Sequence, residues 1–335
     1  MAASVFLNVL LVLAGLVLLY FGGDFLVAGA SGVARKLEIP VLVIGLTVVA
    51  FGTSAPELFV SLISAWKGLM PVSVGNIIGS NIVNIALVLG LVSLVRPLEV
   101  SRKIAFIDTP IMLGTYVVLA LVVFDFESPD RYWRGGTITT AEGVLMVALL
   151  VGYLTFLYFN ARGRGPEALE EVPLDEITEE PRSPMSVLLL KVAAGIAGLT
   201  VGGQLLVDGA SWIAENVFGA SERFIGITVV ALGTSLPELS TSLAAIIRGE
   251  TDISLGNIVG SNIFNSLLVL GTVSILRNID LGAVDFRFDF LFMAAVSLFL
   301  FIVIALKRRL PRWGGVTFFI VYILYFVFLI RTRAT

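Results

Sequence analysis

One segment of this chain occurs twice, and each copy places an acidic residue inside an apolar run. Residues 45–57 read GLTVVAFGTSAPE and residues 226–238 read GITVVALGTSLPE, identical at ten of thirteen positions with an offset of 181. Each apolar run is long enough to cross a bilayer, where a carboxylate is costly unless it has a partner. The glutamates that end the two copies, Glu57 and Glu238, therefore predict a site that binds cations.

The composition of the chain indicates which class of protein it belongs to. Hydrophobic residues make up 57% of the 335 residues, and charged residues only 14%. A soluble domain could not bury so much apolar surface, so the sequence predicts an all-α polytopic membrane protein. Cysteine and histidine are both absent, which excludes disulfides, thiolate or imidazole metal ligands, and Cys- or His-based catalysis. Any metal ion must then bind oxygen, as Na⁺, Ca²⁺, Mg²⁺ and Mn²⁺ prefer to do.

Apolar runs of about 20 residues predict ten transmembrane helices. Their approximate bounds are 4–34, 40–66, 71–95, 103–124, 139–160, 184–214, 223–247, 252–276, 285–306 and 313–331. The matching segments assign five helices to each half of the chain. Because five is an odd number, the second half must be inverted in the membrane relative to the first. Inverted repeats are typical of transporters whose binding site lies between the halves, near the middle of the bilayer.

The sequence therefore divides into two repeats and a linker. The first repeat is 1–160, with its most similar part at about 40–95, and the second is 184–335, with its most similar part at about 222–276. The linker, 161–183, holds seven acidic residues and three prolines, which predicts a solvated segment. Loops after odd-numbered spans hold thirteen Lys and Arg residues and the other loops eight. The positive-inside rule then predicts extracellular termini and a cytoplasmic linker.

The repeated motif GTSxPE predicts a bent helix with oxygen atoms on one face. Ala50, Thr53 and Glu57 follow helical spacing, and Ser54 lies beside them. Pro56 has no N–H group, so the helix bends and a backbone carbonyl loses its donor. Broken backbone is tolerated in a bilayer only where protein or a watery cavity covers it. The second copy repeats the arrangement with Gly233, Thr234, Ser235, Pro237 and Glu238.

A second duplicated motif adds neutral oxygen atoms. Residues 75–84 read GNIIGSNIVN and residues 256–265 read GNIVGSNIFN, identical at eight of ten positions. One helix face of each copy carries a hydroxyl and an amide oxygen, from Ser80 and Asn84 and from Ser261 and Asn265. With the glutamates, these groups suit one calcium ion or a few sodium ions. A purely structural role in hydrogen bonding between helices is an equal alternative for each of the four. The glycines of the motif, Gly75, Gly79, Gly256 and Gly260, predict close helix packing.

Four other acidic residues are expected to have different roles. Asp108 and Asp289 match at the offset of 181 and lie near membrane edges, where capping or pairing in loops is favoured. Asp24 and Asp208 do not match one another, and we expect them to pair helices or line an access path.

The motifs G-T-S-x-P-E and G-N-x-x-G-S-N-x-x-N, each present twice, resemble the α-repeats of the sodium/calcium exchanger family, within the cation/calcium antiporter superfamily. The resemblance spans essentially the whole chain, including ten spans, inverted halves and a central polar loop. That loop is too short for the calcium-binding domains of animal relatives, so the resemblance implies a prokaryotic member.

The resemblance also implies roles for individual residues. Glu57 and Glu238 would bind calcium together with backbone oxygens of Thr53 and Thr234. Asn84 would line the centre. The flanking sodium sites would be built from Ala50, Ser54, Ser80, Ala231, Ser235 and Ser261.

One position departs from the family pattern, because many members have aspartate where this chain has Asn265. A third central carboxylate is therefore missing. Two glutamates neutralise one calcium ion, whereas the three sodium ions usual in the family would leave an excess positive charge, which is costly in a low dielectric. Potassium co-transport accompanies acidic residues at these positions in relatives and is not expected here.

Together, these observations predict a secondary antiporter of the cell membrane that exchanges Na⁺ for Ca²⁺ by alternating access. The resemblance implies that the long first and sixth spans move as the gate. A Ca²⁺/H⁺ antiporter, or one for another divalent cation and H⁺, remains an alternative, as does a cation channel. No GxSxG or HExxH motif is present, so no enzyme is expected. The expected partners are the two ions and the lipid bilayer, with no cofactor, nucleic acid or obligate protein partner.

Overall fold

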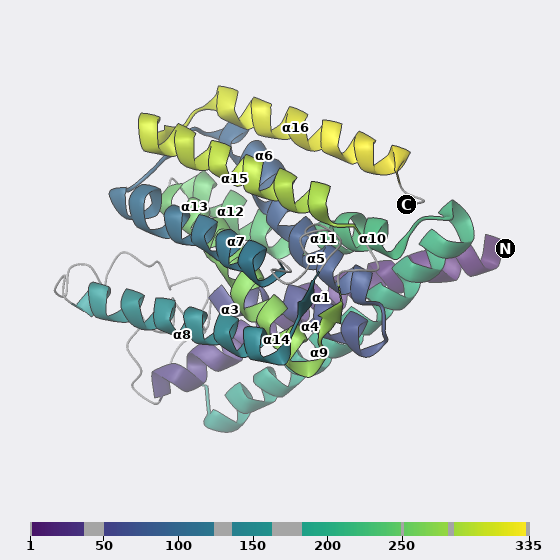
Figure 1. Cartoon of the computed structure of the whole chain (residues 1–335). Coiled ribbons are helices and arrows are strands. Elements are labelled where there is room, and N and C mark those ends of the chain that lie inside the picture. The colour runs from purple at the N-terminus through teal and green to yellow at the C-terminus, as the bar shows by residue number, and fades with distance from the viewer. Residues whose placement is uncertain are drawn as a thin grey trace.

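The computed structural model describes residues 2–36, 50–123, 136–162, 183–248, 251–280 and 285–332, and almost all of them are helical (Figure 1). The helices of the first half are α1 (Ala2–Lys36), α3 (Ala50–Thr53), α4 (Ala55–Trp66), α5 (Met70–Ile82), α6 (Leu89–Val95), α7 (Thr109–Val123) and α8 (Thr140–Arg162). Those of the second half are α9 (Met185–Ile213), α10 (Glu222–Ile225), α11 (Ala231–Thr234), α12 (Leu236–Arg248), α13 (Thr251–Phe264), α14 (Leu270–Leu276), α15 (Arg287–Lys307) and α16 (Arg312–Arg331).

Two features of the secondary structure depart from a plain set of α-helices. Five short segments are π-helical: η2 (Val83–Val88), η3 (Ile104–Asp108), η7 (Ala214–Phe218), η8 (Gly226–Val230) and η9 (Asn265–Val269). Four two-residue strands also occur: β1 (Leu98–Glu99), β2 (Thr137–Ile138), β3 (Ile279–Asp280) and β4 (Arg309–Leu310). Helices nevertheless dominate, and the chain is an all-α polytopic membrane protein.

The predicted count of ten spans is only partly tested. Within the described residues, nine helices are long and apolar enough to cross a bilayer. The predicted span 40–66 is described only from residue 50 onward, where Ala55–Trp66 is apolar but too short to cross alone. The predicted linker, 161–183, lies outside the described residues apart from its two ends.

The two longest helices, α1 and α9, form a pair that crosses the rest of the molecule obliquely (Figure 1). The pair is antiparallel, because residues early in one helix contact residues late in the other. The helices correspond to the predicted first and sixth spans. They contact the remaining helices mainly through the packing of α9 on α4.

The α1–α9 interface is built on glycines spaced by seven residues. A Cβ atom added to Gly22 would lie 2.7 Å from the backbone nitrogen of Leu199, and one added to Gly202 would lie 2.9 Å from the carbonyl oxygen of Gly15. Such contacts leave no room for a side chain, so the backbones touch directly. The six glycines of this interface that follow the seven-residue spacing are Gly15, Gly22, Gly29, Gly195, Gly202 and Gly209.

Each half of the chain completes the packing of the other. Helix α6 packs on α16 of the second half, and its counterpart α14 packs on α8 of the first half. The strands follow the same rule, since β1 pairs antiparallel with β4 and β3 pairs antiparallel with β2. This reciprocal exchange is the arrangement that a two-fold relation between the halves produces.

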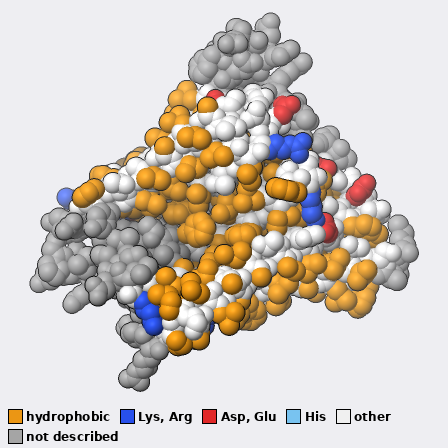
Figure 2. All heavy atoms as spheres, turned by 90° about the horizontal axis from the view of Figure 1, so that it is seen from below, with side chains coloured by type: hydrophobic (Ala, Val, Ile, Leu, Met, Phe, Trp, Pro, Cys, Tyr) orange, Lys and Arg blue, Asp and Glu red, His pale blue; other side chains and the backbone are white. Residues whose placement is uncertain are grey.

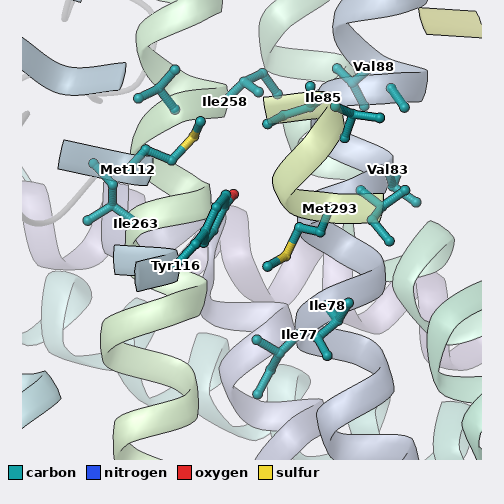
Figure 3. Packing of buried hydrophobic residues seen from close by; sticks show 14 of the residues in the cluster. Ile77, Ile78, Val83, Ile85, Val88, Met112, Tyr116, Ile258, Ile263 and Met293 are labelled. Carbon is teal, nitrogen blue, oxygen red and sulfur yellow. The ribbon is translucent and has the colours of Figure 1, made fainter. Parts of the chain in front are cut away.

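The buried and exposed apolar residues have separate roles. One large core fills the space between α5, α13 and their neighbours, and in Figure 3 Tyr116 and Met293 lie between these two helices. On the face drawn in Figure 2, hydrophobic side chains form broad continuous areas and charged side chains are few. Leu7, Leu190 and Leu324 are more than half exposed on the outer helices. Such a surface is suited to contact with lipid chains.

Three of the four additional acidic residues form ion pairs away from the central glutamates. Asp289 is fully buried and accepts hydrogen bonds from Arg223, at 2.8 Å, and from the Tyr325 hydroxyl, at 2.7 Å. Asp108 contacts Tyr153 on α8 at 3.4 Å and Lys103 at 3.7 Å. Asp208 on α9 pairs with Lys67 in the turn after α4, as expected for a residue that pairs helices, and Asp24 is exposed. Asp108 and Asp289 therefore both bond to residues of other helices, and Asp289 also lies in the first turn of α15.

We expect Gly22→Ala to destabilise the protein by about 1–3 kcal/mol, because the added methyl group would overpack the α1–α9 interface. Gly152→Ala is the matched control, since a Cβ atom added at Gly152 in α8 meets no atom of the described residues within 4 Å. Thermal unfolding of the purified protein in detergent compares the two variants. A Gly22→Ala protein as stable as the control would contradict the direct backbone contact.

Candidate functional site

The two copies of the first motif break their helices at the same place. Ser54 separates α3 from α4, and Ser235 separates α11 from α12, with nearly identical backbone angles (φ −87°, ψ 3° and φ −84°, ψ 5°). Pro56 and Pro237 follow two residues later and cannot donate to the carbonyl oxygen four residues earlier. The bend expected from the prolines is therefore present in both halves.

The breaks place the two glutamates at the beginnings of helices. Glu57 lies in the first turn of α4 and Glu238 in the first turn of α12, where free backbone N–H groups and the helix dipole favour negative charge. Both side chains are fully buried. They lie close enough to interact electrostatically with one another. Among the described residues, neither forms a salt bridge.

Each glutamate receives a hydrogen bond from a predicted serine through one oxygen. Ser235 donates to Glu57 Oε1 at 3.5 Å, across the two halves. Ser261 donates to Glu238 Oε1 at 3.2 Å, within the second half. In both cases the other oxygen, Oε2, is buried and has no hydrogen-bond partner among the described residues. A hydroxyl group is a weak partner for a buried carboxylate, so both groups retain most of their demand for positive charge.

Two asparagines complete a set of four buried acceptor atoms without partners. Asn84 is the second residue of η2, and Asn265 is the first residue of η9. Both side chains are fully buried. Their Oδ1 atoms, like Oε2 of both glutamates, lack hydrogen bonds within the described part of the chain. The four residues form two pairs that match at the offset of 181, Glu57 with Glu238 and Asn84 with Asn265. Buried acceptors are normally satisfied, so this set suits a cation that is bound by oxygen.

The remaining predicted residues lie around this set. The hydroxyl groups of Ser80 and Thr234 are 3.3 Å apart across the two halves, and Thr234 also donates to Asn76 Oδ1 at 3.1 Å. This contact is possible because Gly79 lets α5 approach closely, since a Cβ atom there would lie 2.7 Å from the Ala231 Cβ atom.

Four of the predicted site residues belong to the helices before the breaks: Ala50 and Thr53 in α3, and Ala231 and Thr234 in α11. Ala231 and Ala50 begin α11 and α3, and the side chain of Ala50 lies outside the described residues. Thr53 is half-buried at the end of α3. Ser54 is buried, and its hydroxyl has no partner among the described residues.

The sequence analysis missed a group of buried residues that hold the site asparagines and Thr234. Asn84 donates to Asn262, and Asn265 donates to Asn81. Asn76 joins Thr234 to the backbone of Glu57. Asn76, Asn81 and Asn262 all lie in the duplicated GN-x-x-GSN motif, so their recurrence in both copies was the signal that could have identified them.

The donor set limits what the site can bind. The described residues contain no group of three or more acidic side chains that could hold a metal ion. The site therefore offers two carboxylates, together with neutral hydroxyl, amide and backbone oxygens. With both glutamates ionised, this set carries a charge of −2, enough to neutralise one divalent ion.

Several known proteins are similar to this chain over nearly its whole length. The family model described as sodium/calcium exchanger protein matches residues 7–159 and 187–331. CaxA of Alkalimonas amylolytica is 39% identical, over 94% of this chain and 96% of that protein. The sodium/calcium exchanger MaX1 of Methanosarcina acetivorans is 31% identical, over 96% of this chain and 98% of that protein. A structure of the sodium-calcium exchanger NCX_Mj soaked with sodium and no calcium aligns with a TM-score of 0.65 and 32% identity, over 96% of this chain and 99% of that one.

We expect added Ca²⁺ to raise the unfolding temperature of the purified protein, because a ligand that binds only the folded state stabilises it by roughly 2.7 kcal/mol at a hundred times its Kd. Glu57→Gln and Glu238→Gln should each remove most of this shift. Glu142→Gln is the control, because Glu142 is exposed at the start of α8 and, within the described part of the chain, its side chain bonds only to Thr139. A shift that survives in both site variants would place calcium elsewhere.

Proposed function

The chain belongs to the sodium/calcium exchanger family, and on that basis we propose that it exchanges Na⁺ for Ca²⁺ at one site built around Glu57 and Glu238. The family is one of membrane transporters, and the chain is a multi-pass membrane protein. The observation that carries the proposal is the set of four buried, unpaired oxygen atoms on Glu57, Glu238, Asn84 and Asn265. A cation would supply the positive charge that these groups lack.

In this mechanism, calcium and sodium compete for the same two carboxylates. One Ca²⁺ neutralises both glutamates, and its departure leaves a charge of −2 that only other cations can balance. Sodium ions would enter next to the glutamates, at hydroxyl and backbone oxygens of Ser54, Ser80 and Ser235. Ala50, Thr53, Ala231, Thr234 and Ser261 are the other proposed ligands. Release of one ion type then depends on binding of the other, which couples their movement.

The α1–α9 pair is the proposed moving element. Its glycine interface joins the two helices tightly to one another, so that they would move as a unit relative to α4, on which α9 packs. The ion pair between Lys67 and Asp208 is a contact between α9 and the turn after α4, and such movement would lengthen it. We also propose that both termini are extracellular. Single cysteines introduced near the termini of this cysteine-free chain would test this through labelling from one side of the membrane.

We expect vesicles that contain the purified protein and internal Na⁺ to take up Ca²⁺ when diluted into sodium-free medium. Glu57→Gln and Glu238→Gln should each abolish uptake, because a neutral amide removes half of the charge that binds calcium. Glu142→Gln should transport normally. Near-normal uptake by either site variant would refute the assignment, and flux that needs no counter-ion would favour a channel.

Proton exchange is a second candidate, favoured by one observation. Oε1 of each glutamate accepts a hydrogen bond from a serine hydroxyl, and Oε2 has no hydrogen-bond partner among the described residues. A proton could therefore replace a cation at Oε2. In vesicles without sodium, an outward proton gradient should then drive Ca²⁺ uptake. We expect that gradient to drive far less uptake than a sodium gradient does, and the opposite ranking would make the protein a Ca²⁺/H⁺ antiporter.

A further inference from the structure

We propose that Asn81 and Asn262 are positioning residues that fix the amide orientation of Asn84 and Asn265. Each of these two asparagines would then offer its oxygen, and not its NH₂ group, to the cation. This inference rests on the proposed function, because it concerns the same site. An amide has an acceptor at one end and a donor at the other, and a half-turn exchanges them. Only the oxygen end attracts a cation, so the orientation decides whether the residue is a ligand.

The orientation of Asn84 follows from a chain of hydrogen bonds that begins at a backbone carbonyl. Asn262 Nδ2 donates to the carbonyl oxygen of Asn81 and to the Tyr116 hydroxyl, both at 3.2 Å. A carbonyl can only accept, so this contact determines which end of Asn262 is the nitrogen. At the other end, Asn262 Oδ1 accepts from Asn84 Nδ2 at 3.0 Å. Asn84 must therefore keep its nitrogen on Asn262 and its oxygen on the opposite side.

The orientation of Asn265 follows from a second chain with the same logic. Ser266 Oγ donates its only proton to the carbonyl oxygen of Asn262 at 2.9 Å. It can then only accept from Asn81 Nδ2, which lies 3.2 Å away. The nitrogen of Asn81 also contacts Met293 Sδ at 3.6 Å, which leaves Asn81 Oδ1 to accept from Asn265 Nδ2 at 3.2 Å. The oxygen of Asn265 is thereby turned away from Asn81.

The outcome is that both asparagine oxygens remain unpaired among the described residues although they are fully buried. The two chains cross between the halves, since Asn262 of the second half holds Asn84 of the first, and Asn81 of the first half holds Asn265 of the second. A carboxylate has two equivalent oxygens, whereas an amide such as that of Asn265 has only one end that can bind a cation. Correct orientation at residue 265 is therefore a requirement that an aspartate would not have.

The test measures sodium-driven Ca²⁺ uptake by the full-length protein in vesicles over a range of calcium concentrations. Asn81→Leu removes the acceptor that holds Asn265, so we expect the half-saturating calcium concentration to rise roughly 10- to 100-fold. In an Asn265→Asp parent, the same Asn81→Leu change should shift that concentration little relative to its own parent, because a carboxylate presents an oxygen in either orientation.

The second chain provides a crossed control. Asn262→Leu should weaken calcium binding in the wild type. In an Asn84→Asp parent, Asn262→Leu should have little effect, whereas in an Asn265→Asp parent it should weaken binding as it does in the wild type. Conversely, Asn84→Asp should not suppress Asn81→Leu. Asn257→Leu is the matched control, because Asn257 lies on α13 but, among the described residues, its side chain donates only to Ser242. Any change that Asn257→Leu causes in the half-saturating calcium concentration should therefore be the same in the wild type and in both aspartate parents.

Several results would overturn the proposal. Equal losses in wild-type and aspartate parents would show that the asparagines hold the fold and not the ligand orientation. The same conclusion follows if neither leucine variant yields folded protein in any parent. If both variants bind calcium normally, Asn81 and Asn262 are not needed to orient the two ligand amides, and the proposal is wrong. If the wild type shows no sodium-driven Ca²⁺ uptake, the proposed function itself is wrong. The wild type is measured first, so this outcome is distinguished from failure of the inference about the asparagines.

Discussion

A carboxylate buried without a basic partner inside a membrane protein is the constraint that this structure accommodates. The contrast with Asp289 makes this clear, because that buried acid is neutralised by Arg223 and receives a further hydrogen bond from Tyr325. Glu57 and Glu238 are buried just as deeply, yet no basic side chain among the described residues pairs with them, and their side-chain donors are hydroxyl groups. The helix breaks at Ser54 and Ser235 give them the positive end of a helix dipole, which offsets only part of the cost. The remaining demand for charge is what makes a cation the natural partner of the site.

The site follows the duplication of the sequence, but its hydrogen bonds do not. Glu238 receives its hydrogen bond from Ser261 in its own half, whereas Glu57 receives one from Ser235 in the other half. Ser80, the counterpart of Ser261, instead contacts Thr234. Nearly identical sequences therefore have two different sets of contacts within one molecule.

Much of this could be predicted from the sequence, because a membrane limits the possible structures and the duplication marks the residues that matter. The apolar runs, the bends at Pro56 and Pro237, and the burial of both glutamates follow from rules that depend on single residues and their spacing. The amide network could not be predicted, because hydrogen bonds among asparagines depend on how helices of different halves meet. The π-helical turns at Asn84 and Asn265 were missed for a similar reason, since one extra residue in a turn leaves no clear trace in an apolar run. Nor does the spacing of Gly15, Gly22 and Gly29 reveal its partner helix until α1 and α9 are seen together.

The reciprocal packing of α6 on α16 and of α8 on α14 has a consequence for biosynthesis. When the ribosome has completed only the first half, α6 and α8 are already in the bilayer, but the helices that cover them have not been made. Strands β1 and β2 also lack their partners at this stage, because β4 and β3 belong to the second half. The first half therefore cannot reach its final packing alone and must persist in the lipid as an incomplete assembly until the last helix is inserted.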